Sequence, residues 1–417
     1  SGDLGPAAAA AAAAAAGVAV NGYGHGGRAT ADDAGESGDG GGAAEEHAAS
    51  SHGARCEEQL AVLDTGSPRC SSLALHPSLP LLVAASARQE VSVWDWQRKQ
   101  RLNAFANGNC AGSRVSAMLM LPGPPGLLLL ASSAGCVRVW RQWDEPGMQS
   151  LLCAWQAHDR PGASEMRDAR VALAWQPQRG MLTVTGASSS SLRVWDVRHE
   201  RCAQLLPLGL GDGHAACALT ANAHDALLVA GCTDGTARAL DPRLPPSAAV
   251  VARLDVSPTR APVAAIALQQ LQRPWLAAAS TRGEIVIWDG RRAASSTTSS
   301  SSTPTTPTTA TAAQAAQQQP GALHTIDGHR SGLSAMALHP TAPLLASGSR
   351  NQFIKLFDLS TQPARETHTI RYFDGFLGAR IGPVSSLCFH PSKVMLAVGA
   401  TDSVLSMFST PSRGVTR

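Results

Sequence analysis

Ile285-Val-Ile-Trp288-Asp289 is a short apolar run that ends in Trp-Asp, and the same run, intact or degraded, recurs along the chain. Apolar runs of this length, bounded by Gly, Pro and Ser, are typical of β-strands. Two further strand-like runs precede each copy, for example residues 333–338 and 343–349. The seven copies are Val91-Ser-Val-Trp94-Asp95, Val137-Arg-Val-Trp140, Leu192-Arg-Val-Trp195-Asp196, Ala237-Arg-Ala-Leu240-Asp241, Ile285-Val-Ile-Trp288-Asp289, Ile354-Lys-Leu-Phe357-Asp358 and Val404-Leu-Ser-Met-Phe408.

The spacing inside these repeats is nearly constant. From the last large apolar residue of the first run to the Trp position of the third run, the seven repeats count 19 to 21 residues. Unrelated hydrophobic runs would not keep that spacing so often. Three strands at a period of roughly 40 to 45 residues are typical of propeller blades of the WD-repeat type. The sequence therefore predicts an all-β protein, a seven-bladed WD-repeat β-propeller over residues 56–411.

The two ends of the repeat region predict how the ring closes. Only nine residues follow Phe408, too few for a turn and a fourth strand of the last blade. Gln59-Leu-Ala-Val-Leu-Asp64 has the pattern of a strand and no blade of its own. Because an unpaired strand edge promotes aggregation, we expect this N-terminal strand to pair with the last blade and close it.

The Trp positions are predicted to be structural. Large side chains there are expected to pack between neighbouring blades, where burial contributes about 25 cal/mol per Å². These positions are Trp94, Trp140, Trp195, Leu240, Trp288, Phe357 and Phe408. A His before a blade (His214 and His329) and an Asp before the third strand (Asp234 and Asp402) are further WD-type features that build a buried hydrogen-bond network. No blade keeps the complete set, so the repeats are degenerate.

Composition excludes several classes of function. The chain of 417 residues has a formal net charge of +3 and no basic run longer than Arg291-Arg292, so nucleic-acid binding is not supported. Its nine cysteines form no Cys-x-x-Cys pair, which indicates free thiols in a reducing, cytoplasmic compartment. The ten alanines from Ala7 are too few to cross a bilayer, which needs about 20 residues, so neither membrane insertion nor a signal peptide is expected.

Three segments are predicted to lie outside the folded core. Residues 1–55 are rich in Ala and Gly and form a disordered tail or linker, and residues 412–417 form a C-terminal tail. Residues 293–320 are a disordered Ser/Thr/Pro/Gln insertion between blades five and six. Thr303-Pro304 and Thr306-Pro307 are either acceptors of proline-directed phosphorylation or part of a neutral low-complexity expansion. Because the chain starts with Ser, we expect it to be a fragment.

The sequence contains no recognisable catalytic constellation. Three of the 13 histidines, His76, His339 and His390, precede proline at the ends of first strands. No His-x-x-x-His, Gly-x-Ser-x-Gly or phosphate-binding glycine loop is present. A propeller without such sites is predicted to be a protein-binding platform, not an enzyme, with no cofactor and no metal.

One weak motif suggests an alternative function. Asp196-Val-Arg198, Asp241-Pro-Arg243 and Asp289-Gly-Arg291 resemble the box by which some WD-repeat proteins dock onto the adaptor of cullin-based ubiquitin ligases. An Asp and an Arg after a WD strand also make an ordinary turn with a surface salt bridge. A substrate receptor of such a ligase is therefore the alternative.

A more specific resemblance lies in stretches that blade building does not require. The run Arg371-Tyr-Phe-Asp-Gly-Phe-Leu-Gly-Ala-Arg380 resembles the last blade of the Raptor family, the scaffold subunits of TOR complex 1. Gly348-Ser-Arg-Asn-Gln-Phe353, Trp94-Asp-Trp96 and Phe105-Ala-Asn-Gly-Asn109 are similar to other segments of that family. The resemblance runs in consistent order over residues 59–409.

The resemblance implies a C-terminal Raptor-type propeller that acts as a non-catalytic scaffold in nutrient-responsive growth signalling. The implied partners are the TOR kinase and its small WD-repeat subunit. The implied location is cytoplasmic, or peripheral at the lysosomal or vacuolar membrane through those partners. The family's caspase-like domain and helical solenoid are not in this sequence, and residues 293–320 have no obvious family counterpart.

The candidate contact surface is the loop over residues 372–380. Aromatic and arginine side chains of the kind found there are enriched at binding hot spots. The proposed contact residues are Tyr372, Phe373, Asp374, Phe376 and Arg380. Alternatively, the aromatic residues fold back and seal the junction between blades six and seven.

Overall fold

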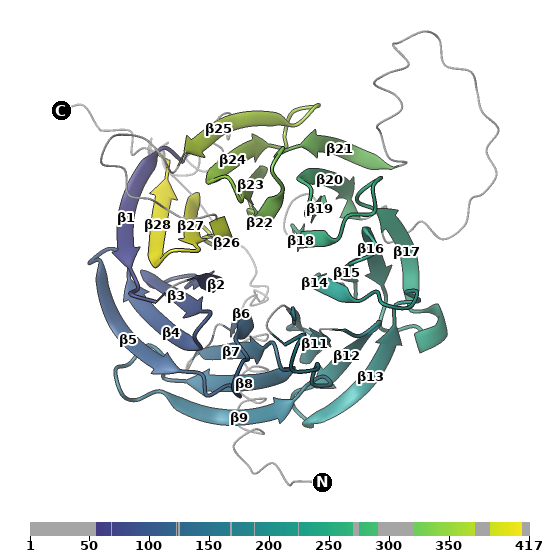
Figure 1. The fold of residues 1–417 in the computed structure, drawn as a ribbon, viewed down its shortest axis with the longest axis horizontal. Helices are drawn as coiled ribbons and strands as arrows, with labels where there is room; N and C mark the ends of the chain where they lie inside the picture. Colours follow the sequence, from purple (N-terminus) through teal and green to yellow (C-terminus); the bar gives the residue numbers. More distant parts are fainter. Residues whose placement is uncertain are drawn as a thin grey trace, which may run out of the picture.

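The computed structural model describes residues 56–67, 69–121, 123, 126–166, 169–186, 188–223, 225–269, 275–290, 321–371 and 384–410. Their strands form seven four-stranded antiparallel sheets arranged as a ring (Figure 1). The prediction of an all-β, seven-bladed propeller is confirmed. The predictions for residues 1–55 and 412–417 lie outside the described residues.

Each blade runs from an innermost to an outermost strand. Blade 1 consists of β2 (Cys70–Leu75), β3 (Leu81–Ser86), β4 (Glu90–Asp95) and β5 (Gln100–Ala106). Blade 2 consists of β6 (Val115–Leu121), β7 (Leu127–Ser132), β8 (Cys136–Arg141) and β9 (Ser150–Gln156). Blade 3 consists of β10 (Leu173–Gln176), β11 (Met181–Thr185), β12 (Ser191–Asp196) and β13 (Arg201–Pro207).

The remaining blades keep this order. Blade 4 consists of β14 (Ala216–Ala221), β15 (Leu228–Cys232), β16 (Thr236–Leu240) and, after the short helix η1 (Pro246–Ala248), β17 (Val250–Asp255). Blade 5 consists of β18 (Val263–Leu268), β19 (Trp275–Ser280), β20 (Glu284–Asp289) and β21 (Ala322–Asp327). Blade 6 consists of β22 (Leu333–Leu338), β23 (Leu344–Ser349), β24 (Phe353–Asp358) and β25 (Arg365–Arg371). Blade 7 consists of β26 (Val384–Phe389), β27 (Met395–Ala400), β28 (Val404–Ser409) and β1 (Glu58–Asp64).

The insertion at residues 293–320 lies at a different place in the repeat than the sequence predicted. β21 follows it in the chain and pairs with β20, with Glu284 opposite Asp327. The insertion therefore falls inside blade 5, between its third and outer strands, and not between blades five and six. The recurring sequence pattern covers only three strands of each blade, so it does not indicate where the outer strand of blade 5 lies. The insertion itself lies outside the described residues.

The N-terminal strand closes the ring, as the sequence predicted. β1 pairs antiparallel with β28, with Glu58 opposite Ser409 and Asp64 opposite Val404. Figure 1 shows β1, in purple, beside β28, in yellow, in this blade. Both backbone edges of the last blade's third strand are therefore paired, and no blade is left incomplete.

The residue at each Trp position stands opposite a leucine of the second strand. These leucines are Leu82, Leu128, Leu182, Leu228, Leu276, Leu345 and Leu396. On its other side, the same position meets a β-bulge in the outer strand of every blade. In blade 1 the extra residue is Leu102, because Val93 faces Asn103 while Trp94 faces Arg101. A bulge increases the local twist, so each outer strand is bent at the same level of the blade.

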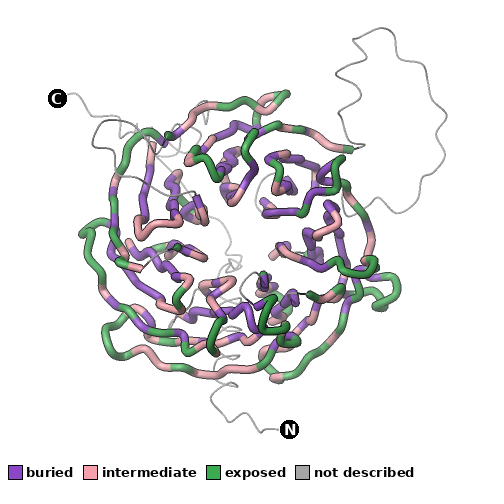
Figure 2. Tube along the Cα trace, viewed as in Figure 1, coloured by how far each residue is buried: buried purple, intermediate pink, exposed green. Residues whose placement is uncertain are grey.

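The core consists of seven hydrophobic clusters, one between each pair of adjacent blades. The second strands are buried on both faces, which explains why β7 reads Leu-Leu-Leu-Leu-Ala-Ser without polar alternation and is buried at every position. Figure 2 shows buried residues concentrated on the inner strands and exposed residues along the outer strands and turns. Stability is therefore distributed around the ring and depends on every blade having two neighbours.

Candidate functional site

The residues at the Trp positions lie between blades. Each belongs to or packs against the cluster that joins its own blade to the preceding one. Trp94 lies with Met395 and Met407 of blade 7, and Trp288 lies with Val229 of blade 4. Leu240 is fully buried in the cluster between blades 3 and 4. These side chains hold the ring together and do not form an exposed surface.

An arginine two residues before the Trp position connects successive blades. Arg138 of blade 2 donates to Asn109 Oδ1 (2.9 Å) and to the carbonyl oxygen of Gly108 (2.8 Å) in the loop after β5. Arg193 of blade 3 pairs with Asp159 Oδ2 (2.6 Å) in the loop after β9. We call Arg138, Arg193 and Arg238 the clasp arginines, because each holds the loop that leaves the preceding blade. The sequence alone did not predict a role for these arginines.

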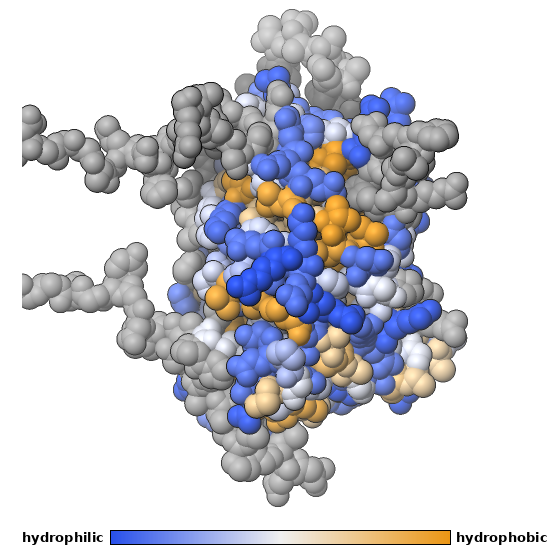
Figure 3. Space-filling view, turned by 90° about the vertical axis from the view of Figure 1, so that its left-hand side faces the viewer, coloured by the Kyte–Doolittle hydropathy of each residue, from blue (hydrophilic) through white to orange (hydrophobic). Residues whose placement is uncertain are grey.

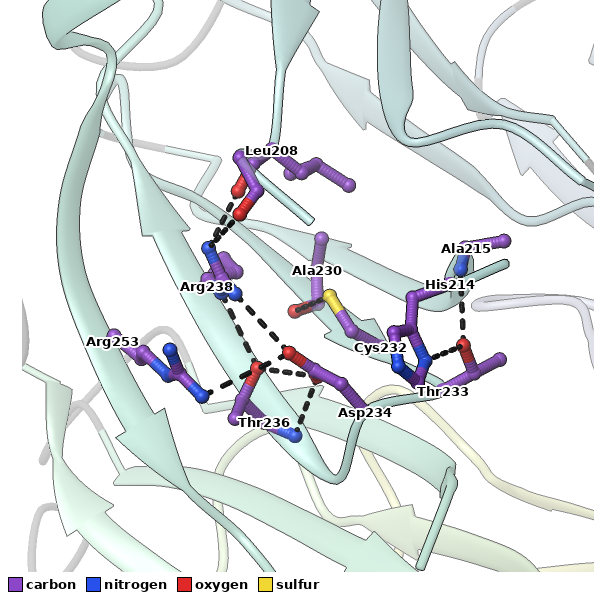
Figure 4. A network of polar contacts seen from close by, with 11 residues as sticks. Leu208, His214, Ala215, Ala230, Cys232, Thr233, Asp234, Thr236, Arg238 and Arg253 are labelled. Atoms are coloured by element: carbon purple, nitrogen blue, oxygen red, sulfur yellow. Dashed lines mark hydrogen bonds and ion pairs between the residues drawn. The ribbon is translucent and has the colours of Figure 1, made fainter. Parts of the chain in front are cut away.

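The third clasp is the most buried of the three (Figure 4). Arg238 Nη1 donates to the carbonyl oxygen of Leu208 (2.6 Å), and Nη2 pairs with Asp234 Oδ2 (3.1 Å). Asp234 Oδ1 also accepts the Thr236 hydroxyl (2.6 Å). Burial acts to raise the pKa of Asp234, but the hydrogen bonds from Thr236 and the Arg238 guanidinium outweigh it and hold that pKa below its ordinary value.

The WD-type network between His and Asp does not form in this blade. His214 is exposed and contacts Thr233 Oγ1 (3.3 Å), while Asp234 pairs with Arg238. With Leu240 at the Trp position, no indole is available as a donor, and the arginine serves as the partner of the aspartate. The contacts of Arg238 thus take the place of the WD-type network in this degenerate blade.

The Asn-Gly-Asn loop after β5 is another inter-blade contact. Asn107 Oδ1 accepts the indole N–H of Trp140 (2.9 Å), and Asn107 Nδ2 donates to Asn109 Oδ1 (2.8 Å). Asn107 is 1% exposed. These residues resembled a family segment in the sequence, and the structure gives them a role in joining blades 1 and 2.

The three His-Pro dipeptides cap the turns after first strands. The Nδ1 atom of His339 accepts the backbone N–H groups of Thr341 (3.1 Å) and Ala342 (2.9 Å). His76 and His390 hold their turns in the same way. An imidazole nitrogen that accepts two N–H groups must be unprotonated, and burial lowers the pKa of each of these histidines.

The pKa of a fourth histidine, His329, is lowered most strongly. His329 Nε2 lies 2.7 Å from Ser347 Oγ in a buried site. Burial, and then the nearby charge of Lys355, lower the pKa of His329 to about 4 from 6.5. The folded protein therefore keeps this ring neutral over a range in which an unfolded chain would protonate it.

We expect the free energy of unfolding to fall as the pH is lowered from about 6.5 toward 4. In this window the unfolded chain binds more protons than the folded one, so the contribution of His329 is complete above pH 6.5 and is lost as the pH falls through 4. Urea unfolding at stepped pH values measures the slope, and His329→Gln is expected to flatten it. An identical slope in the variant and in the unsubstituted protein would contradict this account.

The Asp-x-Arg turns are ordinary turns where they are described. Asp196 Oδ1 accepts the backbone N–H groups of Arg198 (3.0 Å) and His199 (3.1 Å). The guanidinium of Arg243 folds back onto Asp241, with Nη2 to Oδ2 at 2.6 Å. This is the turn and surface salt bridge that the sequence left open as the structural alternative.

The proposed contact residues Tyr372, Phe373, Asp374, Phe376 and Arg380 lie outside the described residues. Their described neighbours form the edge of blade 6. Phe353, which is 37% exposed, lies beneath the guanidinium of Arg371 at 6.0 Å from the ring centroid to Cζ. An aromatic residue and a cation thus stand at the point where the chain enters residues 372–380.

Other kinds of site find little support in the described residues. No group of three or more His, Cys, Asp and Glu side chains there is arranged to hold a metal ion. No helix in the described ranges has the length and apolar character needed to cross a bilayer. On the side of the ring that carries β1, apolar residues lie in separate patches divided by hydrophilic side chains (Figure 3).

The fold and its inter-blade contacts define a WD-repeat propeller. Residues 321–358 match the family model for the WD domain, G-beta repeat. The chain is also similar to the Raptor homologue of Dictyostelium discoideum (29% identity over 82% of this chain and 21% of that protein). Its identity to the Regulatory-associated protein of TOR 1 of Arabidopsis thaliana is 31%, over 80% of this chain and 22% of that protein.

Two further comparisons agree with these. The Target of rapamycin complex 1 subunit mip1 of Schizosaccharomyces pombe is 28% identical over 85% of this chain and 24% of its own length. The crystal structure of Chaetomium thermophilum Raptor superimposes with a TM-score of 0.71, 24% identity, and coverage of 87% of this chain and 30% of that one. The chain therefore corresponds to the WD-repeat propeller of the Raptor family. It spans about a fifth of the length of the curated relatives that it matches.

Proposed function

We propose that this propeller is a non-catalytic scaffold module of a Raptor-type subunit of TOR complex 1. The observation that carries the proposal is the similarity over 80% of this chain to a regulatory-associated protein of TOR. The described inner strands and their polar residues are used to join blades, which fits a rigid platform. On this proposal the partners are the TOR kinase and its small WD-repeat subunit, and the site of action is the cytoplasm or a lysosomal or vacuolar surface reached through them.

The ligase alternative has weaker support. Its motif depends on arginines that are available to a docking adaptor. In the described residues, the Arg243 guanidinium is engaged by Asp241. None of the relatives compared above is named as a ligase subunit.

Affinity purification of the tagged protein from its own cells, followed by mass spectrometry, tests the proposal. Recovery of the TOR kinase with its small WD-repeat subunit is the expected result. Recovery of a cullin and its adaptor without TOR would replace the proposal by the alternative.

The same assay separates the two interpretations of the loop at residues 372–380. We expect Phe376→Ala combined with Arg380→Ala to reduce the recovery of TOR at least tenfold while the midpoint of thermal unfolding stays unchanged, because hot-spot side chains contribute to binding and not to folding. Met148→Ala, at a residue that is 56% exposed, is the matched surface control. A lowered midpoint in the double variant would show instead that the aromatic residues seal the blade junction.

A further inference from the structure

Blade 6 differs from the other blades at one outer corner. In every blade, the first residue of the third strand pairs with the last residue of the outer strand. In blades 1 to 5 and 7 these pairs are Glu90–Ala106, Cys136–Gln156, Ser191–Pro207, Thr236–Asp255, Glu284–Asp327 and Val404–Asp64. Among the seven described pairs, only that of blade 6, Phe353 with Arg371, combines an aromatic residue with a cation.

The two neighbouring blades make this difference a reversal of charge. Blade 5 has Glu284 and Asp327 at the corner, and the outer strand of blade 7 ends with Asp64. Asp327 and Asp64 are exposed. Blade 6 presents the exposed Arg371 instead, beside the partly exposed ring of Phe353. The positive charge at these corners is therefore limited to the width of one blade.

Two further arginines stand at the same end of blade 6. Arg350 lies in the turn between β23 and β24, and Arg330 lies in the loop that enters β22. The register of β22 with β23 brings both segments to this end of the blade. Figure 1 shows β22, β23, β24 and β25 in order from the axis to the rim. We call Arg330, Arg350, Phe353 and Arg371 the blade 6 patch.

The guanidinium groups of the blade 6 patch are available to a ligand. Among the described residues, Arg330, Arg350 and Arg371 take part in no salt bridge, and all three are exposed. Arg371 contacts the ring of Phe353, with Cζ at 6.0 Å from the ring centroid. A contact with a ring face uses no hydrogen-bond acceptor, so the N–H groups of Arg371 remain available as donors.

The spacing of two of these arginines matches that of an extended peptide. Arg350 stands between the second and third strands, and Arg371 ends the fourth. Their backbones are therefore about one and a half strand spacings, or roughly 7 Å, apart. In an extended chain, every second side chain points to the same side, also at intervals of roughly 7 Å. Acidic residues at alternate positions of such a chain can thus face both arginines.

We propose that the blade 6 patch binds an extended acidic peptide segment of a partner protein. Guanidinium groups pair with carboxylates in bidentate geometry, and the ring of Phe353 adds apolar surface beside them. A flat anionic surface such as a membrane would also meet Asp327 and Asp64 of the neighbouring blades, whereas a single extended chain can lie on blade 6 alone. The inference rests on the scaffold role proposed above, since it describes the chemistry of one partner.

Fluorescence anisotropy with the purified full chain tests the proposal. The probes are a labelled peptide of alternating Glu and Ser and its Gln-for-Glu counterpart. We expect the Glu peptide alone to bind, with an affinity that falls as salt is added. Arg350→Ala combined with Arg371→Ala should weaken this binding at least tenfold. The matched control, Arg88→Ala with Arg160→Ala, removes the same charge from exposed residues in the turn after β3 and in the loop after β9.

A second variant uses the residue that two other blades carry at the same position. Blades 1 and 5 begin their third strands with Glu90 and Glu284, so Phe353→Glu introduces a side chain that equivalent strands accept. The introduced carboxylate would neutralise Arg371, and we expect at least a tenfold loss of peptide binding. If thermal unfolding shows that the double arginine variant is not folded, this variant carries the test.

Three results would overturn the proposal. One is equal binding of the Gln peptide, and another is an equal loss in the patch and control variants. The third is binding of inorganic tripolyphosphate or anionic vesicles without the Glu peptide, which would identify a phosphate or membrane ligand. If the chain recovers TOR from cells but binds no peptide, this inference fails alone; if it binds the peptide but recovers no TOR, the proposed function fails alone.

Discussion

Deletion of residues 59–64 is expected to destabilise the whole propeller and not one blade. The deletion removes the partner of β28 along its length and the burial of Ala61 and Leu63, each 2% exposed, from the cluster between blades 7 and 1. Burial of a single leucine contributes about 1.5–3 kcal/mol, and a whole domain is stable by only about 5–15 kcal/mol. We therefore expect the deletion variant to lose its cooperative unfolding transition, measured by circular dichroism and tryptophan fluorescence.

Two substitutions on β1 keep this prediction testable if the deletion variant does not fold. Leu63→Ala should lower the free energy of unfolding by about 2–5 kcal/mol, the usual range for a buried leucine. Val62→Ser, at a neighbouring residue that is 51% exposed, should change it by less than about 0.5 kcal/mol. Equal effects of the two substitutions, or an unchanged transition in the deletion variant, would mean that β1 does not hold the ring closed.

Arg238→Ala is expected to cost about 3–5 kcal/mol of unfolding free energy, because it leaves Asp234 in a partly buried site without its main ion-pair partner. It also removes the donor to Leu208 in the loop from blade 3. Denaturant unfolding at pH 7 measures the loss.

The control for this clasp is Arg243→Ala, in the same blade. Arg243 also pairs with an aspartate, but its side chain is 69% exposed, compared with 8% for Arg238. Removal of an exposed pair changes the free energy of unfolding only slightly, because solvent screens the two charges. Similar losses in the two variants would show that the buried clasp adds nothing beyond a surface salt bridge. Asp234→Asn combined with Arg238→Met should recover part of the loss, since no charge is then left unpaired.

The clasp arginines show which part of the polar network sequence reasoning could have found. Arg138, Arg193 and Arg238 occupy the same position in three successive repeats, and this regularity was visible. Their partners were not, because Asn109, Asp159 and Leu208 share no residue type and contribute carbonyl, amide or carboxylate oxygens alike. A recurring donor can be read from a repeat, whereas an acceptor set by backbone geometry cannot.

The candidate contact loop is another case in which the residue types were visible in the sequence and their contacts were not. The loop at residues 372–380 was chosen from residue types alone, and its placement stays a prediction.

The sequence by itself determined the three inner strands of each blade, the number of blades and the closing strand, because each depends on local apolar patterning and on a repeat length that counting detects. Only the tertiary structure decided which polar side chains meet. Clasp partners come from the loop that leaves the preceding blade, and β1 pairs with β28 from the other end of the repeat region. Closure brings residues separated by hundreds of positions around one axis, and no local pattern encodes that distance.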